Sequence, residues 1–144
     1  MESATALTLG DPVLDREHQE LERLIRALLA APPEGALECL QALKAHAGNH
    51  FEAEDADLRR LGGANATCHL DEHAAVLRSL DEVGEVLLQP EPPPALARRL
   101  ATELLRWLPE HVQAMDAGIA STRTKERLGG VPVLITRKPP SGDA

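Results

Sequence analysis

The stretch LQALKAHAGNHFEAE, residues 40–54, decides the fold. Its apolar residues, among them Leu43 and Ala47, recur every three or four positions, which is the period of an amphipathic α-helix. His50 and Glu54 continue the same stripe, so these two polar side chains lie on the helix face that the apolar residues occupy. We therefore expect a helix that packs against other helices and brings an imidazole and a carboxylate into their common interior.

Three further segments show the helical period, and strong helix breakers separate them. The breakers are Pro32 and Pro33, then Gly62 and Gly63, and then the prolines between positions 90 and 94. The expected helices cover about 15–30, 33–61, 67–88 and 95–120, with Asp15 as the N-cap of the first. Because each has one apolar stripe and the connections are short, the pattern predicts an all-α, antiparallel up-down-up-down four-helix bundle.

The bundle is expected to occupy residues 1–120, and residues 121–144 are expected to form an irregular C-terminal tail. The apolar pattern stops at Ser121, and the tail carries more basic than acidic residues. A short extended piece is conceivable at Val131–Ile135. A loosely packed terminus and a docking segment both remain open as interpretations of the tail.

Composition narrows the function classes. The chain has 144 residues, 1% aromatic residues and a formal net charge of -8, which suits one helical domain and argues against nucleic acid as a partner. No apolar run approaches the roughly 20 residues that span a bilayer, so no membrane contact is expected. Met1–Gly10 does not resemble a signal peptide, and Cys39 and Cys68 do not make a disulfide framework. These features favour a cytoplasmic location.

The histidines fall on the apolar stripes rather than among the charged positions. A lone histidine on such a face is usually a core residue with a satisfied hydrogen bond, and one H-x-x-x-H pair is weak evidence. Here all four helices supply imidazoles, and two carboxylates join them, so burial without compensation would be costly. A metal is the simplest compensation. The candidate ligands are His18, His50, Glu54, His69, His73, His111 and Asp116. His46 lies off the stripe and is interpreted as a supporting or packing residue.

Seven mixed ligands are too many for one tetrahedral zinc ion. They suit two six-coordinate ions that share two bridging carboxylates and a bridging oxygen species, with imidazoles as the terminal ligands. This arrangement leaves one coordination position open. The donor set therefore predicts a dinuclear site that binds one small molecule.

Four motifs then show a resemblance to a known family. They are D-R-E-H at 15–18, H-F-E-A-E at 50–54, H-L-D-E-H at 69–73 and W-L-P-E-H-V-Q-A-M-D at 107–116. The chain resembles the hemerythrin family over roughly residues 14–119, in particular its single-domain bacterial members. The whole pattern is far more specific than any one of its parts.

The resemblance implies a non-heme centre of two iron ions with an oxo or hydroxo bridge, and dioxygen as the ligand. It assigns His69, His73 and His111 to one iron, His18 and His50 to the iron with the open position, and Glu54 and Asp116 to the bridges. Phe51 and Trp107 match apolar positions near the family's oxygen pocket. The chain departs from the family at His46, where many relatives have tyrosine, and at Pro109, which interrupts the fourth helix.

The function implied is reversible oxygen binding, as a carrier, store or local supplier, and not an enzyme activity. Three alternatives remain: an oxygen or redox sensor that acts through a partner, a di-iron peroxide or nitric-oxide reductase, and an iron store. Oxidase sites of the ferritin-like kind are mostly carboxylates, whereas this site is rich in histidine, which favours binding over cleavage of oxygen.

The spacing of His111 and Asp116 predicts a distortion of the fourth helix. Five residues correspond to about 140° of rotation on a regular α-helix, so the two side chains cannot both point at one metal pair. We expect a widened π-type turn, a kink at Pro109 or a long reach by Asp116.

Overall fold

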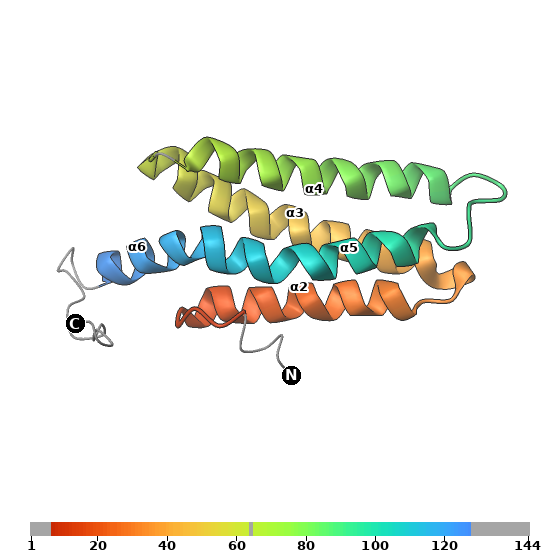
Figure 1. The fold of residues 1–144 in the computed structure, drawn as a ribbon, viewed down its shortest axis with the longest axis horizontal. Coiled ribbons are helices and arrows are strands. Elements are labelled where there is room, and N and C mark those ends of the chain that lie inside the picture. Colours follow the sequence, from red (N-terminus) through yellow and green to blue (C-terminus); the bar gives the residue numbers. More distant parts are fainter. Residues whose placement is uncertain (1–6, 64, 128–144) are drawn as a thin grey trace.

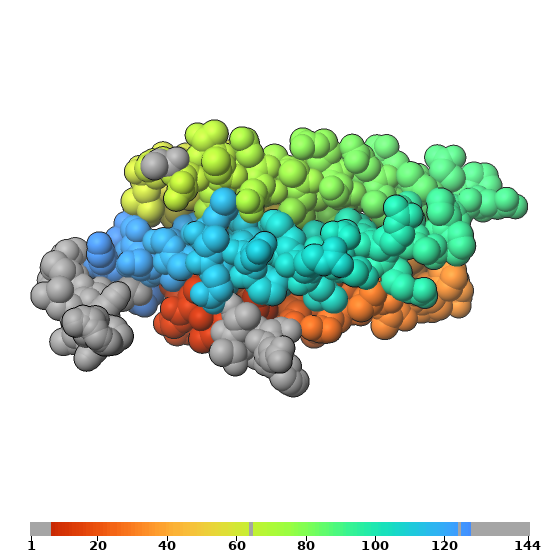
Figure 2. Space-filling view, in the orientation of Figure 1, coloured from red at the N-terminus to blue at the C-terminus, as the bar shows by residue number. Residues whose placement is uncertain are grey.

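The computed structural model describes residues 7–63 and 65–127, which form a bundle of four antiparallel helical rods (Figure 1). The elements are α2 (Pro12–Ala30), η1 (Pro33–Gly35), α3 (Ala36–Leu61), α4 (Ala66–Leu87), α5 (Leu96–His111), η2 (Val112–Asp116) and α6 (Ala117–Arg127). The last three form one continuous rod. Successive rods run in opposite directions, and α4, α2 and the α5–η2–α6 rod are packed together on the face shown in Figure 2. The predicted all-α four-helix bundle is confirmed.

The first helix begins earlier than the sequence suggested. Asp11 is the N-cap of α2, and its carboxylate accepts hydrogen bonds from the backbone N–H groups of Val13 and Leu14 at 3.0 and 3.1 Å. Pro12 follows as the first helical residue, where its missing N–H costs nothing. The expectation that Asp15 caps this helix is wrong. Its carboxylate instead accepts hydrogen bonds from the backbone that precedes the cap, including that of Leu9 at 2.7 Å.

The interior consists of two apolar clusters along the bundle axis. The larger one contains Leu28, Leu43, Leu80 and Leu104, with further side chains from all four rods. The smaller one lies at the other end of the bundle and is formed by Leu14, Leu58, Ile119 and Ala120. Along every rod, the candidate ligands lie between residues of the two clusters. The polar site is therefore closed by apolar packing above and below.

The fourth rod continues beyond the point where the sequence analysis ended it. Helix α6 extends to Arg127, so the expected end near Ala120 is wrong. Ion pairs, which the apolar pattern could not reveal, connect this last stretch to the bundle: Arg123 with Asp57 at 2.9 Å, Glu126 with Arg60 at 2.8 Å and Arg127 with Asp11 at 3.3 Å. The expectation for Val131–Ile135 lies outside the described residues.

Replacing Arg123 by alanine is expected to lower the melting temperature by about 3 °C, because a partly exposed ion pair is worth about 1 kcal/mol. Thermal unfolding followed by circular dichroism measures the effect, and replacement of the exposed Lys125 on the same helix is the control. Burial raises the pKa of Asp57, but hydrogen bonds from Arg60 and Arg123 outweigh it and hold the pKa below 3.8. The difference in melting temperature between the Arg123 and Lys125 variants should therefore persist above pH 3.8. It should vanish as the pH falls through the lowered pKa of Asp57. Equal melting temperatures at pH 7 would show that the pair contributes nothing.

The expectations for the cysteines and for membrane-spanning segments can be compared with the fold. Cys39 is half-buried, Cys68 is exposed, and both are free thiols. Within residues 7–63 and 65–127, no helix combines the length and the hydropathy that crossing a membrane requires.

Candidate metal centre

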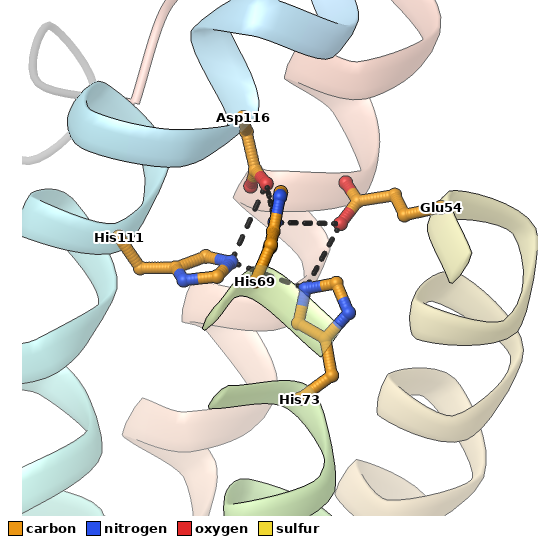
Figure 3. Close-up of side chains that lie close together, drawn as sticks. All are labelled: Glu54, His69, His73, His111 and Asp116. Atoms are coloured by element: carbon orange, nitrogen blue, oxygen red, sulfur yellow. Dashed lines mark hydrogen bonds and ion pairs between the residues drawn. The ribbon is translucent and has the colours of Figure 1, made fainter. Parts of the chain in front are cut away.

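The seven candidate ligands converge in the middle of the bundle, and all are buried. They form two groups, in each of which the ligand atoms lie within 4.8 Å of one another. One group contains Glu54, His69, His73, His111 and Asp116, and Figure 3 shows these five side chains pointing towards one another from α3, α4, α5 and η2. The other group contains His18, His50, Glu54 and Asp116. The two carboxylates thus belong to both groups.

Each carboxylate directs one oxygen towards each group. Glu54 Oε1 lies 3.2 Å from His73 Nε2, and Glu54 Oε2 lies 3.0 Å from His50 Nε2. The arrangement at Asp116 is the same: Oδ1 lies 2.8 Å from His69 Nε2, and Oδ2 lies 3.0 Å from His18 Nε2. Carboxylates placed in this way could each contribute one oxygen to a cation in either group.

Three further carboxylates fix the imidazole rings from behind. Glu17 accepts a hydrogen bond from Nδ1 of His50 at 2.5 Å, Asp55 from Nδ1 of His73 at 2.7 Å and Glu72 from Nδ1 of His111 at 2.7 Å. In each pair the carboxylate belongs to one rod and the imidazole to the next rod along the chain. Such partners orient a metal-binding ring and fix which nitrogen faces the metal.

These three carboxylates were not predicted from the sequence, although a signal for them was present. Each is the immediate neighbour of a candidate ligand: Glu17 precedes His18, Asp55 follows Glu54 and Glu72 precedes His73. On a helix, the neighbour of an inward-facing residue lies about 100° around the axis and so faces an adjacent helix. Acidic residues next to ligand positions are therefore candidates for this supporting role.

The orientation of the rings tests whether a cation fits. A neutral imidazole carries one N–H, and in His73 and His111 that proton is donated from Nδ1 to a carboxylate. The two Nε2 atoms, which then carry lone pairs, face each other at 3.2 Å. In addition, both ring nitrogens of His18 and both oxygens of Glu54 lack a hydrogen-bond partner among the described residues. Unsatisfied buried acceptors are costly, and bound cations would satisfy the carboxylate oxygens and the imidazole nitrogens that carry lone pairs.

The two shared carboxylates set the charge of the site. Burial lowers the pKa of His18, but contacts with Asp116 and Glu54 outweigh burial and raise the pKa to about 9. Burial also raises the pKa values of Glu54 and Asp116, but contacts with the imidazoles outweigh it and hold both below their ordinary range. Both carboxylates therefore remain ionised at neutral pH and attract cations.

A local change in helix type brings Asp116 into the site. Residues Val112–Asp116 form a π-helix, and the N–H of Ala117 donates to the carbonyl of Val112, five residues earlier. The wider turn places Asp116 on the same side of the rod as His111, which a regular α-helix would not. The predicted π-type distortion is confirmed, and it begins three residues after Pro109.

Aromatic side chains cover the site on the side of the larger apolar cluster. The ring of Phe51 stacks on His73 with centroids 4.1 Å apart, and the ring of Trp107 stacks on His111 at 4.4 Å. His46 does not join either ligand group. Its Nε2 donates to the backbone carbonyl of Glu17 at 3.2 Å, and its ring lies parallel to that of His50. The structure thus brings together all seven candidate ligands, whose role as ligands stays a prediction.

A buried cluster that can hold metal, inside a four-helix bundle, defines a class of metal-binding helical proteins. The chain belongs to the hemerythrin family: the family model described as the hemerythrin HHE cation binding domain matches residues 9–121. It is similar to a bacteriohemerythrin of Ralstonia nicotianae, with 35% identity over 111 residues that cover 77% of this chain and 80% of the relative. No solved structure matches the chain significantly.

Proposed function

We propose that the seven side chains hold two iron ions and that the protein binds dioxygen reversibly at one of them. The observation that carries the proposal is the sharing of Glu54 and Asp116 between two ligand groups, each carboxylate with one oxygen towards each group. Mixed imidazole and carboxylate donors suit iron. Reversible oxygen binding is the function that membership of the hemerythrin family favours.

The donor count indicates where a small ligand would bind. Beside the two shared carboxylates, one group contains three imidazoles, and the other contains only those of His18 and His50. The groups thus have five and four donors, so a bridging oxygen species shared by both ions would complete the first octahedron and would leave one position open on the second. Bound iron would supply the electrons and the binding position for dioxygen. The chain itself surrounds the ligands with apolar packing, to which the buried ring of Phe51 and the half-buried ring of Trp107 contribute.

The donor set also favours a binding protein over an enzyme. Five imidazoles and two carboxylates converge here, whereas di-iron oxidase sites in helical bundles are built mostly from carboxylates. The free thiols of Cys39 and Cys68 are compatible with a reducing, cytoplasmic setting. A sensor that acts through a protein partner is the alternative, because the same oxygen-binding site would serve it.

Absorption spectroscopy tests the proposal. The purified chain, reduced under argon and then exposed to air, is expected to develop a visible charge-transfer band that disappears when oxygen is removed. Elemental analysis should find about two iron ions per chain. Protein isolated from iron-replete cells with zinc, or with no metal, would contradict the iron site. A band that appears once and does not reverse would exclude reversible oxygen binding and leave the iron site intact.

A further inference from the structure

The seam between α4 and α5 lies beside the site and is only loosely packed. Helix α4 packs less closely on α5 than on α3. A groove of about 390 Å³ follows this seam, and its lining includes Val76, Leu100 and the edge of Trp107. His111, although buried, belongs to the α5 side of this loosely packed seam. Close packing between the two helices is therefore sparse, and polar contacts across the seam contribute to holding them together.

The backbone around His111 is also weakly restrained. Pro109 has no N–H, so the carbonyl of Leu105 loses its usual helical donor. After His111 the rod widens into the π-helix Val112–Asp116. His111 thus lies between two interruptions of the α-helical hydrogen-bond ladder, and its side chain needs another restraint.

Glu72 supplies that restraint from across the seam. A single oxygen, Glu72 Oε1, accepts hydrogen bonds from His111 Nδ1 at 2.7 Å and from Trp107 Nε1 at 3.2 Å. The two rings lie one turn apart on α5 and stack with an angle of 27° between their planes. One acceptor on α4 therefore fixes two rings on α5. By contrast, within the described chain, the carboxylates of Glu17 and Asp55 each accept from one imidazole only.

We propose that Glu72 is a positioning residue that orients His111 and Trp107 as one unit. It holds the proton of His111 on Nδ1, so that Nε2 faces the cluster, and it holds the indole of Trp107 flat against that imidazole. Because the side chain of Glu72 is 39% exposed, it also connects the buried site to the surface groove. The effect on metal binding rests on the proposed function, whereas the orientation of Trp107 does not.

The test compares three variants of Glu72 in the full chain with the metal content measured. Glu72→Ala removes the acceptor, Glu72→Asp keeps the charge but is one methylene too short, and Glu72→Gln keeps an oxygen at the same reach without the charge. Asp71→Ala is the matched control, since Asp71 is the exposed acidic neighbour in the same motif. The near-ultraviolet circular dichroism of Trp107 is a clean signal, because the chain has one tryptophan and no tyrosine.

With Glu72→Ala, we expect metal release to an excess of chelator to accelerate by about 10–100-fold, because losing a partner of a metal-binding histidine usually lowers metal affinity by that factor. The Trp107 signal should shrink at the same time. Glu72→Gln should restore most of both properties, Glu72→Asp should resemble Glu72→Ala, and Asp71→Ala should resemble the wild type. Far-ultraviolet circular dichroism verifies that each variant is folded. If Glu72→Ala does not fold, the comparison of Glu72→Gln with Glu72→Asp tests the role of the shared acceptor.

Two results would overturn the proposal. One is metal release and a Trp107 signal in Glu72→Ala that match those of Asp71→Ala. The other is rescue by Glu72→Asp but not by Glu72→Gln, which would show that charge matters and the shared acceptor does not. If the wild type binds no metal, the proposed function fails, but the Trp107 signals still decide whether Glu72 orients that ring.

Discussion

Replacing Glu54 by alanine is expected to lower the metal content from about two ions per chain to one or fewer. Glu54 is completely buried, and its two oxygens face different ligand groups, 3.2 Å from His73 Nε2 and 3.0 Å from His50 Nε2. Its removal therefore takes one donor from each group at once. It also leaves the group of His18 and His50 with Asp116 as its only carboxylate. Elemental analysis of the purified variant measures the effect.

His46→Ala is the matched control for Glu54→Ala. His46 lies on the same helix, and its ring is parallel to that of His50 at 6.1 Å, but it belongs to neither ligand group. This variant should retain nearly the full metal content. If His46→Ala loses as much metal as Glu54→Ala, then Glu54 is not the bridge that its geometry suggests. A Glu54→Ala protein with a full complement of metal would have the same consequence.

The helices and the ligand positions could be predicted because they share one physical signal. Burial of one face imposes the helical period on every residue of that face, polar ones included, so His50 and Glu54 stand out on the stripe of Leu43 and Ala47. The π-turn was predictable for a related reason. Once His111 and Asp116 are both required to face inward, the rotation per residue of an α-helix no longer fits their spacing.

The remaining features depend on contacts between segments that lie far apart in the sequence. The cap of α2 is an exception: Asp11 and Asp15 are both suitable caps, and Pro12, which directly follows Asp11 and suits the first helical position, is the local signal that favours Asp11. Helix α6 has little apolar pattern beyond Ala120, and its ion pairs to Asp57 and Asp11 join residues 66 and 116 positions apart. Such ion pairs produce no periodic pattern in the sequence, because charged residues are common at every surface position.

In the site itself, the contacts of Glu17, Asp55 and Glu72 with imidazoles likewise join residues that lie far apart in the sequence. In the sequence, Glu72 resembles any other acidic residue on the solvent-facing side of a helix. Its hydrogen-bond partner His111 lies 39 residues further along the chain. Its neighbour Asp71 has the same charge but adjoins no ligand and is exposed. Adjacency to His73 marks Glu72 as a candidate, but only the packing of α4 beside α5 shows that its partner is His111.

Removing the metal is expected to lower the melting temperature by at least about 10 °C. An ion present at about 1,000 times its dissociation constant stabilises the folded state by about 4 kcal/mol, because the unfolded chain does not hold the ligands together. At this chain length, each kcal/mol corresponds to about 3–4 °C. Loss of the ions also leaves imidazoles and carboxylates buried around an empty centre, and protons on His18 and its neighbours would compensate only in part. Thermal unfolding of the protein before and after exhaustive chelation measures the shift.

Glu54→Ala provides the control for this experiment, since it should hold one ion or fewer before chelation. Its melting temperature should therefore change less than that of the wild type when chelator is added, although both proteins experience the same solvent. Helical content, followed in the far ultraviolet at low temperature, separates loss of stability from loss of fold, because the two apolar clusters on either side of the site contain none of the candidate ligands. Equal melting temperatures of metal-loaded and metal-free wild type would mean that the cluster is satisfied by its own protons and ion pairs, and the case for a resident metal would then fail.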